Sequence, residues 1–209
     1  MKLPFTKDTT AKKKEQSSLE LPLKMMHSES NCMELLSEAL FKLIQQVPSH
    51  RPIVIVCVGT DRSTGDCLGP LVGMQLKRLQ LDGAHLYGTL DQPVHAMNLN
   101  ETLTTIHQHF NQPFIIAVDA CLGQLTSVGC IQLGNGPVKP GAGVNKELPP
   151  VGDMHMTGIV NVGGFMEYFV LQNTRLSLVM AMSETIAKAI HAALHMRKQW
   201  SPIPLVKID

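Results

Sequence analysis

Three side chains suited to acid–base work or metal binding stand far apart in the sequence: Asp66, Asp119 and His155. Two carboxylates and an imidazole, if folding brings them together, can hold a divalent cation, or one carboxyl can act as acid beside another as base. Structural roles also stay open. An aspartate after a strand often caps a helix or turn, and a histidine often fills a structural position.

The first of these carboxylates lies in a polar loop after the most apolar run of the chain. Residues 53–58 are an unbroken apolar, mostly β-branched run, which predicts a strand buried on both faces and hence a central, parallel one. Pro70 stands where a first helical residue would be, so we predict a helix over 70–79. Loops at the carboxyl ends of such strands carry the sites of open α/β sheets. Four further side chains of this loop are therefore candidate substrate contacts: Asp61, Arg62, Ser63 and Thr64.

Two more candidate substrate contacts, Asp91 and His95, follow a second predicted strand over 84–90. Simpler roles are open for these residues too. Asp91 can open a turn, and Asp61 with Arg62 can form an ion pair that shapes its own loop.

Strands and helices alternate along the rest of the chain. Asn31, with Glu34 three residues later, resembles a capping box. The further elements that we predict are helices from Asn31 to Pro48, from about Asn100 to Phe110 and over 176–198, and strands over 114–118 and 128–133. This order predicts a three-layer α/β/α sandwich with a mainly parallel sheet.

The domain organisation follows from polarity and periodicity. Residues 1–28 are polar and lack a clear hydrophobic period, so we expect a flexible tail. Residues 29–200 are expected to form one α/β domain, and residues 201–209 a second tail. Residues 134–152 are rich in glycine and proline and are expected to form a flap over the substrate.

Composition narrows the function classes. The net charge is +1, and no basic face follows the N-terminal segment, so nucleic acid is not an expected partner. The five cysteines are an odd number without a CxxC pair, which indicates reduced thiols and no thiolate zinc site. We find no signal peptide and no membrane-spanning stretch, and expect an intracellular protein that does not bind membranes.

Residues 58–73, VGTDRSTGDCLGPLVG, resemble the signature of the YyaC family of sporulation proteins from spore-forming bacteria. The resemblance covers about residues 30–197, and its other matching segments are 88–96, 118–123, 150–153 and 161–167. That family is similar in fold to the spore germination protease and the hydrogenase maturation endopeptidases. The resemblance therefore implies a phosphorylase/hydrolase-like three-layer sandwich.

The resemblance also implies a site. The germination protease has one aspartate in an Asp-Ala-Leu-Gly-Pro loop, matched here at Asp66, and another in a strand-end Asp-Ala, matched at Asp119. The maturation endopeptidases place metal-binding acidic residues at these positions and a histidine before a glycine, which would be His155 before Gly158. The implied catalytic residues and metal ligands are thus Asp66, Asp119 and His155, around a divalent Zn, Ni or Mn ion if a metal is used.

We therefore expect a sporulation-associated, peptidase-like hydrolase that cleaves a protein or peptide substrate with a carboxylate pair, with or without a metal ion. Its expected location is the cytoplasm of the sporulating cell or forespore. Two alternatives stay open: a non-catalytic module that binds a peptide or small anion, and an amidase or nucleosidase-like hydrolase on a related sandwich. The sequence leaves the oligomeric state open.

Overall fold

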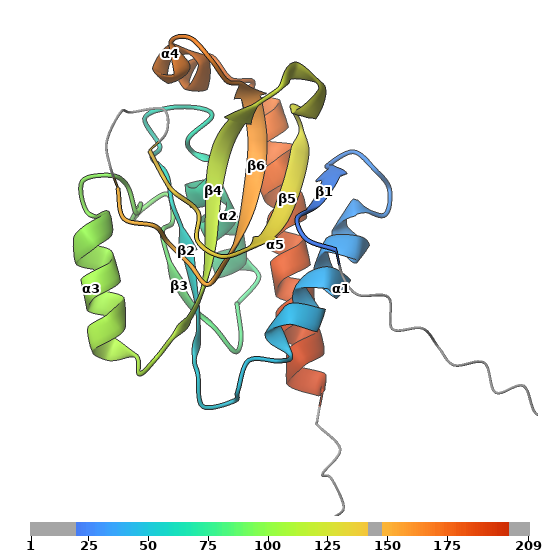
Figure 1. Ribbon diagram of the computed structural model, residues 1–209, viewed down its shortest axis with the longest axis vertical. Coiled ribbons are helices and arrows are strands. Elements are labelled where there is room, and N and C mark those ends of the chain that lie inside the picture. The colour runs from blue at the N-terminus through green and yellow to red at the C-terminus, as the bar shows by residue number, and fades with distance from the viewer. Residues whose placement is uncertain (1–19, 142–147, 201–209) are drawn as a thin grey trace, which may run out of the picture.

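The fold is built on a six-stranded sheet in the order β1-β5-β6-β4-β2-β3 (Figure 1). It is seen in a computed structural model that describes residues 20–141 and 148–200. The strands are β1 (Leu23–Met26), β2 (Ile53–Cys57), β3 (His85–Tyr87), β4 (Phe114–Gly123), β5 (Cys130–Asn135) and β6 (Met154–Val162). The neighbours β3, β2, β4 and β6 run parallel, and β5 is antiparallel to both β6 and β1. The predicted α/β class with a mainly parallel sheet is confirmed.

Helices cover both faces of this sheet, which makes three layers (Figure 1). They are α1 (Cys32–Ile44), α2 (Leu68–Arg78), α3 (Leu99–His109), α4 (Glu167–Gln172), α5 (Leu176–Gln199) and the short 3-10 helix η1 (Leu125–Ser127). The helices α1, α2 and α5 share one apolar core with the sheet, while α3 packs in a second core on the opposite face. None of these helices, within the described residues, is long and apolar enough to cross a membrane.

Strand β2 shows why its sequence is apolar throughout. Ile53 and Ile55 belong to the core under α1, α2 and α5, whereas Val54 and Val56 belong to the core under α3. All five residues of β2 are buried. A strand that lies between two helical layers has no solvent-facing side, so its side chains do not alternate in polarity.

Helix α2 lies unusually close to the sheet because it presents glycine to the neighbouring backbone. A Cβ atom on Gly73 would stand 1.8 Å from the backbone oxygen of Gly88. We expect Gly73→Ala to lower the free energy of unfolding by about 1–3 kcal/mol, because the helix must move away from the sheet. Urea unfolding measures this. Lys77→Ala, on the exposed side of α2, should stay within about 0.5 kcal/mol of the parent.

The structure corrects the predicted N-terminal boundary. Residues 1–28 were expected to be a tail, but Leu23–Met26 form edge strand β1, which pairs with β5. The strand is short, and Lys24 interrupts its apolar residues, so periodicity gave little signal. Residues 1–19 and 201–209 lie outside the described residues. The prediction of a capping box at Asn31 is also wrong, since the Asn31 side chain makes no capping hydrogen bond.

Two other predicted elements differ in extent. The strand predicted to end at Val118 continues as β4 to Gly123, so Asp119 lies within the strand instead of after it. The expected flap over 134–152 begins as the end of β5 and returns beside itself through a Val138–Val151 bridge. Val151 is fully buried, so this part of the segment is packed core. Residues 142–147 lie outside the described residues.

Candidate functional site

Asp119 is a buried carboxyl in the longest strand of the sheet. Side chains alternate along β4, and Ile115 and Ala117 face the α3 side, so Asp119 faces that side as well. It lies where the neighbouring strand β2 has just ended, since Val58 donates its N–H to Val118 O at 2.7 Å. Only 5% of Asp119 is exposed. Its Oδ1 accepts a hydrogen bond from the Ala120 N–H at 2.8 Å.

Asp66 reaches the same place from the loop that follows β2. The loop folds back on its own start, because the Thr60 N–H donates to the backbone oxygen of Asp66 at 3.2 Å. A Cβ atom on Gly59 would stand only 2.0 Å from that oxygen, and Gly59 has a φ of +143°. Only glycine fits there. The fold-back sets Asp66 over the end of β2.

These two residues are called the carboxyl pair below, and the charge of Asp66 affects the protonation of Asp119. Burial raises the pKa of Asp119 well above its ordinary value, and the nearby charge of Asp66 raises it further. Burial also raises the pKa of Asp66, against a hydrogen bond from the Thr60 backbone that lowers it. Burial and the charge of Asp66 both disfavour ionisation of Asp119, so Asp119 keeps its proton to a higher pH than an exposed aspartate does. A pair whose members differ in this way can supply an acid and a base.

Two residues close to the carboxyl pair, Thr157 and Cys121, were not predicted from the sequence. Thr157 is buried and lies directly opposite Asp119 on β6. Cys121 has its pKa raised to about 11, mainly by burial and also by the charge of Asp119, while a hydrogen bond with Thr157 lowers it. Cys121 is therefore a neutral thiol at pH 7 and no nucleophile. The position of Thr157 beside Asp119 follows only from the pairing of β4 with β6. No motif in the sequence indicates that pairing.

His155 is not brought to the carboxyl pair. Its ring lies over β5, on the side away from β4, because a Cβ atom on Gly134 would stand 2.6 Å from its Nε2. Its Nδ1 lies 2.9 Å from the backbone oxygen of Gly136. Within the described residues, no three His, Cys, Asp or Glu side chains gather in a way that could hold a metal ion. The predicted metal set of Asp66, Asp119 and His155 does not assemble in this structure.

The candidate contacts of the first loop divide by exposure. Asp61 and Arg62 are exposed and form no ion pair with each other, while Thr64 is half-buried. Ser63 is 8% exposed, and its hydroxyl is the one buried side-chain oxygen of residues 20–141 and 148–200 that has no hydrogen-bond partner.

Removal of the Ser63 hydroxyl tests whether this group has a structural role in the loop. No internal hydrogen bond is lost in Ser63→Ala, so we expect the free energy of unfolding to stay within about 0.5 kcal/mol of the parent or to rise slightly. Urea unfolding checks this. A loss of more than about 1 kcal/mol would show instead that the hydroxyl holds the loop together.

The other two candidate contacts separate in space. Asp91 is exposed and forms a surface ion pair with Lys77 at 3.7 Å. His95 is half-buried and lines a cavity at the end of β3. Asp91 is not part of that lining.

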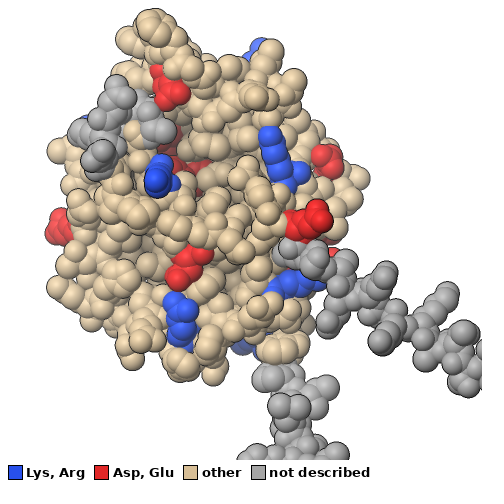
Figure 2. Space-filling view, in the orientation of Figure 1, with Lys and Arg blue, Asp and Glu red and all other residues tan. Residues whose placement is uncertain are grey.

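The surface is hollowed near the carboxyl ends of the parallel strands. Figure 2 shows acidic atoms recessed in a hollow of this face, below the end of the molecule that carries α4, with Lys and Arg scattered over the rest of the view. Helix α4 is tied to the Asp66 loop, because the Gly65 N–H donates to Leu171 O at 2.8 Å.

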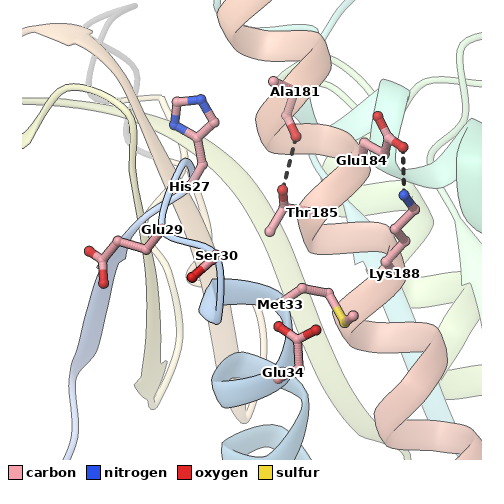
Figure 3. Close-up of a pocket in the computed structure, with 9 residues that line it drawn as sticks. All are labelled: His27, Glu29, Ser30, Met33, Glu34, Ala181, Glu184, Thr185 and Lys188. Atoms are coloured by element: carbon pink, nitrogen blue, oxygen red, sulfur yellow. Dashed lines mark hydrogen bonds and ion pairs between the residues drawn. The ribbon is translucent and has the colours of Figure 1, made fainter.

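A separate groove lies on the other side of the sheet, between the β1–α1 turn and α5 (Figure 3). It has a volume of about 380 Å³, and a Glu184–Lys188 ion pair of 2.6 Å lies along its α5 wall. His27 lines the groove on the side of the β1–α1 turn (Figure 3), and its Nδ1 lies 2.9 Å from Gly129 O. The groove contains none of the predicted site residues.

The fold and the site together define an α/β protein with a buried carboxyl, Asp119, and a half-buried one, Asp66, at the carboxyl ends of its parallel strands. Residues 24–189 match the family described as a protein of unknown function, DUF1256, and the chain belongs to that family. It is 61% identical over 150 residues to the "Uncharacterized protein YyaC" of Bacillus subtilis (strain 168), which covers 72% of each chain. The predicted resemblance to the YyaC family is thereby confirmed.

A solved structure also resembles this chain. It is the crystal structure of a NiFe hydrogenase maturation protease HycI from Thermococcus kodakarensis KOD1, with 18% sequence identity and a TM-score of 0.47. The match covers 73% of this chain and 99% of the other.

Proposed function

We propose that this protein is a sporulation-associated, peptidase-like hydrolase that cleaves peptide bonds with the carboxyl pair, Asp66 and Asp119. The observation that supports the proposal is that the fold brings two carboxyls, distant in sequence, close enough for the charge of one to act on the other. Asp119 is buried, Asp66 is half-buried, and both have raised pKa values. Carboxyls in such a state serve as acid and base in hydrolysis. The link with sporulation depends on the sequence resemblance of residues 58–73.

In the proposed reaction, ionised Asp66 takes a proton from water as the water oxygen attacks the peptide carbonyl carbon. Protonated Asp119, the more buried partner, gives its proton to the carbonyl oxygen, which yields a neutral diol. Asp66 then passes its proton to the leaving nitrogen as the C–N bond breaks, and Asp119 recovers a proton from the diol. The products are a carboxylic acid and an amine, and both carboxyls end as they began.

The proposal uses no metal ion. The donor set implied for a metal needs His155, whose Nδ1 faces Gly136 O and whose ring lies over Gly134. Two carboxylates without a third side chain are a poor fit for the zinc sites that carry out hydrolysis, which have three protein ligands. A requirement for added Zn²⁺, Mn²⁺ or Ni²⁺ would contradict this part of the proposal.

A second candidate is a non-catalytic module that binds a peptide on the same scaffold. The observation that favours it is the 5% exposure of Asp119, since a substrate carbonyl must reach that carboxyl for the reaction to occur. The two candidates differ in whether peptide is consumed.

The test is a search for cleavage with the full chain. A mixture of blocked peptides is incubated with the protein, with and without EDTA, and new termini are detected by mass spectrometry. We expect cleavage that EDTA does not abolish and that disappears in the double variant Asp66→Asn/Asp119→Asn. Asp82→Asn is the matched control, because Asp82 is exposed and pairs with Lys198 on the surface. Peptide that binds but is never cut would favour the binding module.

A further inference from the structure

A cavity at the carboxyl end of β3 has no role in the chemistry described above. It has a volume of about 410 Å³ and lies between the end of β3, the segment after it and the start of α3. Small-ligand sites in proteins have volumes of this order, and they form at such strand ends in α/β sheets. His95 is the one predicted substrate contact among its lining residues.

Two inter-strand spacings separate the cavity from β4, the strand that carries Asp119. Val94, in its lining, forms a parallel bridge with Val58, and the Gly59 N–H donates to Val94 O at 2.8 Å. Val58 in turn bonds to Val118, the residue before Asp119. Neighbouring strands are about 4.8 Å apart, so Val94 is roughly 10 Å from the strand that carries Asp119. An extended peptide covers that distance in about three residues.

Most polar groups of the cavity wall are already used to hold the wall in place. The Asn98 side chain accepts from the His95 N–H at 2.8 Å and donates to Pro93 O at 3.0 Å. The Thr102 hydroxyl donates to Asn98 O at 2.9 Å, and the Thr89 hydroxyl accepts from the Gln92 N–H at 3.2 Å. The wall is therefore fixed before any ligand arrives, which lowers the entropy lost on binding.

Three polar side-chain groups of the wall remain available: one nitrogen of the His95 ring, the Tyr87 hydroxyl and the carboxamide of Gln92. The Met97 N–H donates to His95 Nδ1 at 3.3 Å, so the proton of the neutral ring belongs on Nε2. Neither that Nε2 nor the Tyr87 hydroxyl bonds to another group among the hydrogen bonds of the described residues. Both can donate to a ligand, and the Tyr87 oxygen can also accept.

The wall carries no fixed charge. Its ten lining residues include no Asp, Glu, Lys or Arg, so a charged ligand group would lose water without gaining an opposite charge. An uncharged group that both accepts and donates hydrogen bonds fits better, and a carboxamide is such a group.

We propose that this cavity is a subsite for an uncharged carboxamide side chain, asparagine or glutamine, about three residues from the cleaved bond. This inference rests on the proposed peptidase function, because it takes the bound chain to be the substrate. The wall would bind the side chain through Tyr87 and His95, and the chain would extend along the strand ends toward Asp119.

The experiment measures binding without turnover. Full-length Asp119→Asn protein is titrated with three blocked hexapeptides, alanine except for one central Gln, Glu or Lys, and backbone amide shifts are followed by NMR. We expect the Gln peptide to shift amides of residues 87–98 and to bind at least about tenfold more tightly than the other two. Tyr87→Phe, which removes one oxygen atom, should weaken its binding about 3- to 10-fold, as should His95→Ala.

Equal affinities for the three peptides, or shifts confined to other parts of the chain, would overturn the subsite. The Tyr87→Phe result stands even if His95→Ala fails to fold, and Asp82→Asn should bind as the parent does. Failure of the subsite and failure of the peptidase function are distinguishable. If the Gln peptide binds selectively but the unsubstituted chain cleaves no peptide, only the peptidase function is contradicted. If the chain cleaves peptides but binds the Gln peptide no more tightly than the others, only the subsite is contradicted.

Discussion

Asp119→Asn is expected to slow peptide cleavage by about 10²- to 10⁴-fold and, at neutral pH, to make the folded chain more stable. The loss of rate follows because an asparagine cannot give a proton to the carbonyl oxygen and recover it, and general acid–base catalysis contributes about 10²- to 10⁴-fold. The gain in stability follows because a carboxyl that is 5% exposed, beside a second carboxyl, is costly to ionise.

The stability of the parent should depend on pH in a definite direction. The pKa of Asp119 is higher in the folded chain than in the unfolded one, so the folded state binds more protons between the two values. The contribution of Asp119 to stability is therefore fully present below its unfolded pKa, near 4, and is lost as pH rises through its folded pKa. The excess stability of Asp119→Asn should be small at pH 4 and larger at pH 7.

Thermal melts of parent and variant at several pH values test this prediction. Each kcal/mol corresponds to about 2–4 °C in a chain of this size. The exposed control Asp82→Asn should show no such gain. If Asp119→Asn retained the full cleavage rate, or if its advantage in melting temperature were greatest at pH 4, the roles assigned to Asp119 would be wrong.

Sequence reasoning found the parts of the fold that have strong local signals. The run at Ile53–Cys57 is apolar because two helical layers cover it, and helix α5 has a clear period over its 24 residues. Edge strand β1 was missed because it has four residues, one of them Lys24. Its place in the sheet comes from its antiparallel partner β5, a contact between residues more than 100 positions apart.

The site shows the same division between local and distant information. Asp66 and Asp119 could be selected because each lies close to the end of a predictable strand, and strand ends meet at one edge of the sheet. His155 was misplaced because its direction depends on Gly134 across a strand pair. Thr157 was missed because its importance comes only from being opposite Asp119 on β6.

The rate of peptide cleavage is expected to depend strongly on pH. The proposed reaction needs one carboxyl of the pair ionised and the other protonated, so kcat/KM should follow a bell-shaped curve. Outside the two limits the rate should fall about tenfold per pH unit. Because both pKa values are raised, the bell should lie at higher pH than two ordinary exposed carboxyls would give. Its two limits belong to the pair as a whole, since the residues interact.

Asp66→Asn tests whether the two carboxyls interact. Removing the charge of Asp66 removes one of the two causes that raise the pKa of Asp119, while burial, the larger cause, stays. In this variant, the pKa of Asp119 should therefore fall below its value in the parent and still exceed that of an exposed aspartate. Carboxyl ¹³C NMR of the full chain, labelled at aspartate and assigned by comparison with Asp119→Asn, measures it. An unchanged pKa would mean that the two carboxyls do not interact, and a carboxyl pair that does not interact cannot share the proton on which the proposed cleavage depends.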